Sequence, residues 1–179
     1  MQAHVAGPRR SKLNAMARSA DTLIIAPSDD HAAALALARA AHLEVTETPE
    51  QPLAMWGAFA DGRMVGTISL DTYGGLPVVG RIAVSQEYRG SGLGRRLLDT
   101  LEAEALRRGL TELWATARAP GFFVAMGYAV VAEGRERDSL LSECFTCGQY
   151  SDECHPQAVR KSFVPCVPSP RTNDEPHAL

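Results

Sequence analysis

The spacing of apolar residues changes along the chain, and each change marks an expected element. In the middle of the chain, apolar side chains alternate with polar or small ones, which is the period of a half-buried strand. Asp61-Gly62 interrupts this alternation and predicts a tight hairpin turn between strands over 55–60 and 63–71. A third strand over 78–84 would complete an antiparallel meander.

Helical spacing replaces the alternation after the meander. Over 92–108 apolar residues recur every three or four positions, and Gly109 is suited to end the helix. A strand over 113–116 follows. The order strand, glycine-rich turn, helix, strand predicts a crossover that joins two parallel strands. The apolar residues of this helix are Leu93, Leu97, Leu98, Leu101, Ala105 and Leu106.

Shorter signals flank these elements on both sides. Ser28-Asp29-Asp30 offers an amino-terminal cap, and Gly127 is suited to close a short helix. The pattern therefore predicts an α/β fold, in which helices flank a mixed sheet built from an antiparallel meander and a parallel crossover. The flanking elements expected are a strand over 23–26, a helix over 31–42, a loop over 46–52, a helix over 120–126 and a final strand over 128–132.

Composition divides the chain into a globular centre and two polar ends. Hydrophobic residues make up 45% of the chain and charged residues 22%, which is enough apolar surface for one core. The first 20 residues lack periodicity, and four prolines follow residue 164, so both ends are expected to be disordered. A translation start at Met16 is an open hypothesis. The expected divisions are a leader over 1–20, a folded domain over 21–135, a cysteine-bearing extension over 136–166 and a tail over 167–179.

Charge and hydropathy remove several classes of function. The net charge of −3 gives no overall attraction to polyanions, and no basic run is interleaved with aromatic residues, so nucleic acid is not an expected partner. No apolar run reaches the length of a secretory core or of the ~20 residues that cross a bilayer. A cytoplasmic protein without a membrane partner is expected.

The candidate chemistry lies in the glycine-rich loop that joins the third strand to the long helix. Three glycines let the backbone approach a ligand, and the helix amino end and nearby arginines favour a phosphate group. The alternative is a turn that uses glycine only for its geometry. The spacing fits neither G-x-G-x-x-G nor a loop ending in G-K-[ST]. The loop residues are Arg89, Gly90, Ser91, Gly92, Leu93, Gly94 and Arg95.

In combination, two motifs resemble the GNAT superfamily of N-acetyltransferases. The stretch IAVSQEYRGSGLGRRLL over 82–98 is similar to its strand, loop and helix, and APGFFVAMGY over 119–128 is similar to its second landmark. The resemblance implies a GNAT fold with a V-shaped cleft between the strands at 78–84 and 112–116. It also implies that acetyl-CoA is the cosubstrate, with its pantetheine arm held by the backbone of Ile82, Ala83 and Val84 and its pyrophosphate by the glycine-rich loop.

The catalytic acid and base are less clear from the motifs. Phe123 stands where many relatives place a tyrosine that protonates the leaving thiolate, and the strand over 78–84 has no glutamate. Asp71, or a water relay with Tyr73 nearby, is therefore the candidate base. The structural reading, which the residue type favours, makes Asp71 a turn or cap residue and Tyr128 a core-packing residue.

Cysteines cluster after the resemblance ends. Cys144-x2-Cys147 and Cys154 suggest a tetrahedral zinc site with His155 or Cys166 as the fourth ligand, and unligated thiols are the alternative. The segment also resembles a cysteine-bearing extension of bacterial proteins similar to N-acetylglutamate synthase. Its place after the last expected strand suggests that it covers the acceptor side of the cleft.

These observations lead to one expected function and one rival. The chain is expected to be an acyltransferase that moves an acetyl group from acetyl-CoA to a primary amine of a small molecule, with an amino acid as one candidate. The rival is a noncatalytic acyl-CoA-binding or sensory module, for which the phenylalanine in place of the acid is the best argument. A homodimer stays open.

Overall fold

The computed structural model describes residues 23–43 and 52–163. Its first half contains β1 (Ile24–Pro27), α2 (His31–Ala40), β2 (Ala54–Ala60), β3 (Arg63–Tyr73), β4 (Leu76–Val84) and the 3-10 turn η1 (Gln86–Tyr88). Its second half contains α3 (Leu93–Arg107), β5 (Glu112–Ala117), α4 (Pro120–Ala125), β6 (Ala129–Val130), α5 (Arg135–Leu141), η2 (Cys144–Thr146) and β7 (Gln157–Ser162). The predicted leader, most of the predicted loop over 46–52, Cys166 and the predicted tail lie outside the described residues.

One mixed sheet organises the described chain. Its seven strands run in the order β1-β2-β3-β4-β5-β7-β6, and every neighbouring pair is antiparallel except β4 and β5. Asp61 and Gly62 both have positive φ, 50° and 76°, as the hairpin turn between β2 and β3 requires. The predicted meander and parallel crossover are confirmed.

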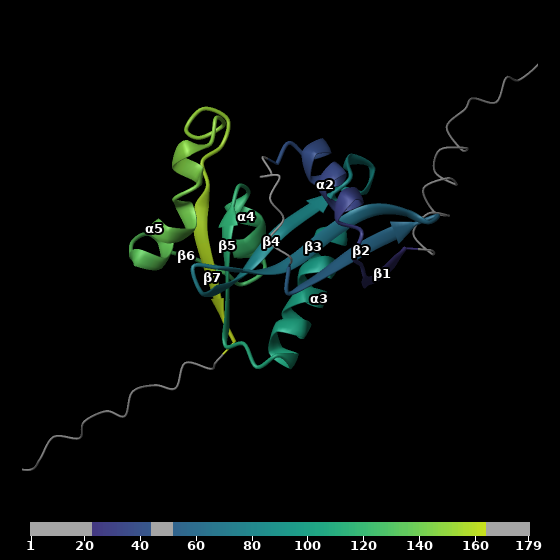
Figure 1. The fold of residues 1–179 in the computed structure, drawn as a ribbon, viewed down its shortest axis with the longest axis horizontal. Coiled ribbons are helices and arrows are strands. Elements are labelled where there is room, and N and C mark those ends of the chain that lie inside the picture. Colours follow the sequence, from purple (N-terminus) through teal and green to yellow (C-terminus); the bar gives the residue numbers. More distant parts are fainter. Residues whose placement is uncertain (1–22, 44–51, 164–179) are drawn as a thin grey trace, which may run out of the picture.

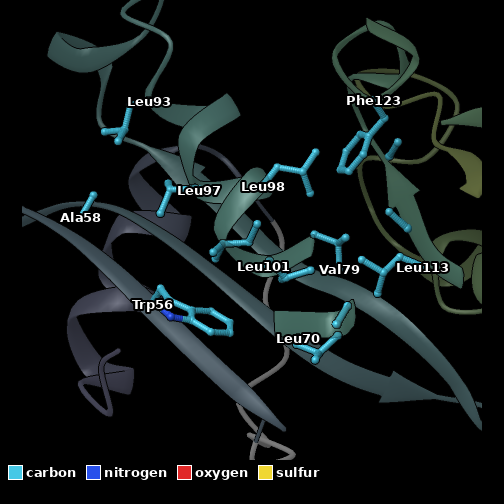
Figure 2. Packing of buried hydrophobic residues seen from close by; sticks show 14 of the residues in the cluster. Trp56, Ala58, Leu70, Val79, Leu93, Leu97, Leu98, Leu101, Leu113 and Phe123 are labelled. Carbon is cyan, nitrogen blue, oxygen red and sulfur yellow. The ribbon is translucent and has the colours of Figure 1, made fainter. Parts of the chain in front are cut away.

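Helices cover the sheet on both faces. Figure 1 shows α2 and α3 on opposite sides of β2, β3 and β4. The Asp30 side chain accepts from the Ala33 N–H at 2.9 Å and caps α2, as predicted. Figure 2 shows Leu101 of α3 close to Val79 and Leu98 on the side of Phe123, all within the main core. The buried residues of α3 are Leu93, Leu97, Leu98, Leu101 and Ala105. Among the described helices, none is long and apolar enough to cross a membrane.

The end of the described chain differs from the prediction. The expectation that the strand near 128–132 is the last one was wrong, because β7 follows it and lies between β5 and β6. The sequence of β7 has only two buried apolar residues, Ala158 and Val159, so its alternation is weak. Long-range partners fix it instead, since it pairs along β5 and places Arg160 over the Trp114 ring.

A largely buried ion pair fastens β7 to α3. Lys161 Nζ lies 2.6 Å from Glu102 Oε2 and also donates to the Met126 carbonyl at 3.0 Å. The ammonium group stands 5.6 Å from the centre of the Tyr128 ring. Burial and the nearby Glu102 carboxylate raise the pKa of Tyr128, which keeps its phenol neutral at physiological pH.

This ion pair makes a testable contribution to stability. The substitution Lys161→Ala should lower the free energy of unfolding by about 2 kcal/mol, because Glu102 would keep a largely buried charge without its partner. The matched control is Arg63→Ala, which breaks an exposed pair with Glu87 and should leave the free energy of unfolding nearly unchanged. Urea denaturation measures both, and equal changes would contradict the assignment.

Candidate functional site

The two parallel strands at the centre of the sheet separate soon after they meet. Their ladder has one Cα pair among the described residues, Val78 with Trp114. Beyond it β4 continues through Ile82, Ala83 and Val84, still paired with β3, while β5 continues beside β7. In Figure 1 the two strands diverge. The backbone of β4 that the sequence analysis assigned to the cofactor therefore lies past the last pairing with β5.

The glycine-rich loop follows directly from this end of β4. Gly90 and Gly92 have φ of 74° and 83°, a region that other residues rarely adopt. Gly92 also caps α3 without any side-chain hydrogen bond. The first-turn amides of a helix have no partner within it, and a Cβ on either glycine would meet nothing within 4 Å. The loop thus combines an electropositive helix end with open space for an anionic group.

The polar side chains of the loop have two roles. Ser91 Oγ donates to the Tyr88 carbonyl at 2.6 Å, and Arg89 Nε donates to the Val84 carbonyl at 3.2 Å. These bonds fix the loop on the strand before it. Arg95 is exposed on the first turn of α3, so its charge stands beside the helix end. The loop residues predicted from the sequence are therefore brought together at one place.

The short helix α4 closes the space beside α3. A Cβ on Gly94 would lie 3.5 Å from the Phe122 ring, so the two helices approach closely there. Phe123 is buried, and its ring stands edge-on to those of Phe122 and Tyr128 at centroid distances of 5.2 Å each. Phe123, at the position where the resemblance implied an acid, is thus part of the apolar core.

The two candidate base residues share one face of β3. Asp71 stands opposite Val78, and its carboxylate accepts from the Ser69 hydroxyl at 3.2 Å. Tyr73 stands opposite Leu76 at the turn, and its hydroxyl shares a hydrogen bond of 3.0 Å with Ser142. Asp71 therefore lies opposite the one described residue of β4 that pairs with β5, and Tyr73 lies two residues farther from the stretch where the strands diverge. A catalytic role of either residue stays a prediction.

Arg118 is a residue of this region that sequence reasoning missed. It follows β5, and its guanidinium donates to the His42 carbonyl at the end of α2 and, at 3.2 Å, to the Gln149 side chain. It thereby joins α2 to the cysteine-bearing segment across the end of the diverging strands. No local signal marks it, because both partners are distant in sequence.

Three cysteines of the predicted zinc site lie in the segment between α5 and β7. Cys144, Cys147 and Cys154 are half-buried free thiols, and His155 is exposed. Burial, with smaller contributions from the other two cysteines, raises the pKa of the Cys144 thiol, so this group is protonated and unreactive near neutral pH. In the part of the chain that the structure describes, no three His, Cys, Asp or Glu side chains are grouped to hold a metal ion. The zinc prediction receives no support there.

A separate hollow lies at the other end of α3. It has a volume of about 640 Å³ and is open to solvent. Its charged side chains include Glu104, whose pKa is lowered to about 2 by hydrogen bonds from Arg107 and Arg108. It is remote along α3 from the glycine-rich loop and is not the predicted site.

Comparisons with known proteins agree with this geometry. The sequence model of the acetyltransferase (GNAT) family matches residues 25–128. An uncharacterized N-acetyltransferase of Chlorobaculum tepidum is 28% identical over 87 residues, which cover 48% of this chain and 56% of that protein. A probable N-acetyltransferase 14 of Danio rerio is 33% identical over 86 residues, 44% of this chain and 31% of that protein. The match therefore spans less than two thirds of either relative.

A solved structure shows the same fold. N-acetylglutamate synthase from Neisseria gonorrhoeae, complexed with coenzyme A and N-acetyl-glutamate, superposes with a TM-score of 0.63 at 18% identity. The match covers 79% of this chain and 36% of that one. At this identity the likeness concerns the fold alone.

Metal removal tests the interpretation of the cysteine segment. Because the described residues hold no metal-ligand group, treatment with EDTA should leave the melting temperature unchanged. Circular dichroism during thermal unfolding, with zinc content determined on the same preparation, measures this. One zinc per chain, together with a lower melting temperature after chelation, would support the predicted zinc site.

Proposed function

The chain belongs to the acetyltransferase (GNAT) family, and from this we propose that it transfers an acetyl group from acetyl-CoA to a primary amine of a small molecule. The observation that carries the proposal is the position of the glycine-rich loop. It follows β4 through the short turn η1, beyond the stretch of β4 that pairs with β3 only, so one ligand would reach both the strand backbone that is not paired with β5 and the helix end.

Different parts of the chain would bind the pantetheine arm and the pyrophosphate of acetyl-CoA. The backbone of Ile82–Val84 would hold the pantetheine arm, because this stretch pairs only with β3. The amides at the start of α3, together with Arg89 and Arg95, would hold the pyrophosphate. Gly90 and Gly92 leave the approach open.

The chemistry requires positioning more than a covalent nucleophile. The thioester supplies an activated acetyl group: the amine nitrogen bonds to its carbonyl carbon, the carbon–sulfur bond breaks, the nitrogen loses a proton and the thiolate leaves. A backbone amide near Val84 would polarise the carbonyl oxygen as charge develops on it. With Phe123 in the core, the thiolate would leave without a side-chain acid from α4, which its stability as an anion allows.

An amino acid is the first acceptor class to test. The support is the fold likeness to a structure that contains N-acetyl-glutamate, together with the Arg118 link between α2 and the cysteine-bearing segment, which we expect to cover the acceptor side. The rival function, a noncatalytic acyl-CoA sensor, is favoured by Phe123 alone.

A thiol-release assay decides between the two functions. Acetyl-CoA is mixed with the protein and with a panel of amino acids, including glutamate, and of small amines. We expect thiol release that depends on one class of amine. Binding of acetyl-CoA in calorimetry without release for any acceptor would support the sensor, and failure to bind acetyl-CoA would overturn the proposal.

The phosphate contacts can be tested separately from the chemistry. Arg95→Ala should raise the KM for acetyl-CoA about tenfold, because a hydrogen bond to a charged group is lost. With S-acetylpantetheine, which lacks the pyrophosphate, the same variant should match the wild type. Arg96→Ala is the control, since Arg96 is the next residue of α3 but points to the Leu23 carbonyl. Equal effects with both donors would remove Arg95 from the phosphate site.

A further inference from the structure

The pairing between β3 and β4 contains an irregularity at the centre of the site. Ile68 stands opposite Ile82, whereas Leu70 stands opposite Val79, so Gly80 and Arg81 together face Ser69 alone. Two residues against one is a β-bulge. It lies between Val78, where β4 pairs with β5, and the Ile82–Val84 backbone, which pairs with β3 only.

The bulge determines which side chains of β4 enter the core. Val79, before it, and Ile82 and Val84, after it, all pack against the same main core. In a regular strand Val79 would share its face with residues 81 and 83, because the side-chain period of a strand is two. The extra residue therefore keeps the core face apolar while the strand bends.

Ser69 satisfies a backbone group at this bulge. Its hydroxyl accepts from the Arg81 N–H at 3.0 Å and donates to Asp71 Oδ2 at 3.2 Å. The serine side chain is only 2% exposed. A bulge disrupts the regular ladder, so this side chain replaces a bond that a regular partner strand would have supplied.

Asp71 occupies the space above the bulge. A Cβ built on Gly80 would lie 1.8 Å from Asp71 Oδ2 and 2.6 Å from Ser69 Oγ. No side chain fits there while the carboxylate is in place, so the aspartate, the serine and the glycine are mutually dependent. This contact explains why residue 80 is glycine, although its backbone conformation does not require glycine.

We propose that Ser69 and Asp71 are positioning residues that hold the Gly80–Arg81 bulge and thereby set the place where β4 leaves β5. On this view Asp71 does not remove the proton of the amine. Its effect reaches the cofactor through Ser69 and the backbone of Ile82–Val84, so the inference rests on the proposed binding of acetyl-CoA to that backbone.

The first test measures coenzyme A binding by calorimetry, without any acceptor. Ser69→Ala and Asp71→Ala should each weaken the affinity for coenzyme A about tenfold. The first variant removes the acceptor of the Arg81 N–H, and the second removes the carboxylate that orients this acceptor. Thr67→Val is the matched control. Thr67 is an equally buried hydroxyl on the same strand face, but it bonds to the Trp56 carbonyl of β2, so this variant should lower stability and leave the affinity unchanged.

The second test separates positioning from base catalysis. Asp71→Asn keeps the shape and an oxygen that accepts from Ser69, so it should keep most of kcat with an unchanged pH profile. A base requires the carboxylate, and its loss would reduce kcat strongly and remove the corresponding limb of the profile. That result, with coenzyme A affinity unaltered, would overturn the inference.

The third test uses the contact between Asp71 and Gly80. Gly80→Ala should lower the melting temperature, and adding Asp71→Ala should raise it again, although Asp71→Ala alone lowers it in the wild-type background. This reversal of sign needs neither cofactor nor activity. Additive effects would overturn the inference whether or not coenzyme A binds. Failure of the wild type to bind coenzyme A would instead count against the proposed function.

Discussion

The structure depends on one constraint of the backbone. Strand β4 must keep its hydrogen bonds to β3 on one side, while most of its other side is not paired with β5. A strand in the middle of a sheet normally has both sides paired, and an unpaired polar backbone needs another partner. Here β3 retains β4 along its length, while β5 pairs with it at Val78 and then turns away toward β7. We propose that the released side of β4, together with the start of α3 beyond the glycine-rich loop, holds acetyl-CoA.

The surrounding parts keep this release stable. The leucines of α3 pack against β2, β3 and β4 in the main core. On the other side of the separation, β7 pairs with β5 along six residues. The ion pair between Lys161 and Glu102 then ties that neighbour back to α3. The two halves of the sheet are therefore joined where β4 pairs with β5 and through α3. Their separation does not require a flexible hinge.

Local patterns predicted the parts of this architecture that local physics determines. Asp61-Gly62 favours the positive φ that its turn adopts, and the leucine spacing after Gly92 favours a helix from its own sequence. The place of the glycine-rich loop between β4 and α3 was predictable from its residues, whereas its binding of a phosphate group stays a prediction. Tertiary partners determine the rest. The strand β7 is too polar to be recognised alone, and Arg118 has significance only through residues far along the chain. The bulge was not visible either, since an alternating sequence does not reveal where two residues oppose one.

The insertion of β7 between β5 and β6 also has a consequence for the order of folding. Both neighbours are synthesised before it, and neither pairs with the other in the finished sheet. During synthesis, the meander and the crossover helix can form their mutual contacts before β7, the central strand of the other half of the sheet, has been made. Sequence separation slows the formation of such contacts. The glycine-rich loop and its neighbours in the meander are therefore synthesised before the half of the sheet that contains β5, β6 and β7 is complete.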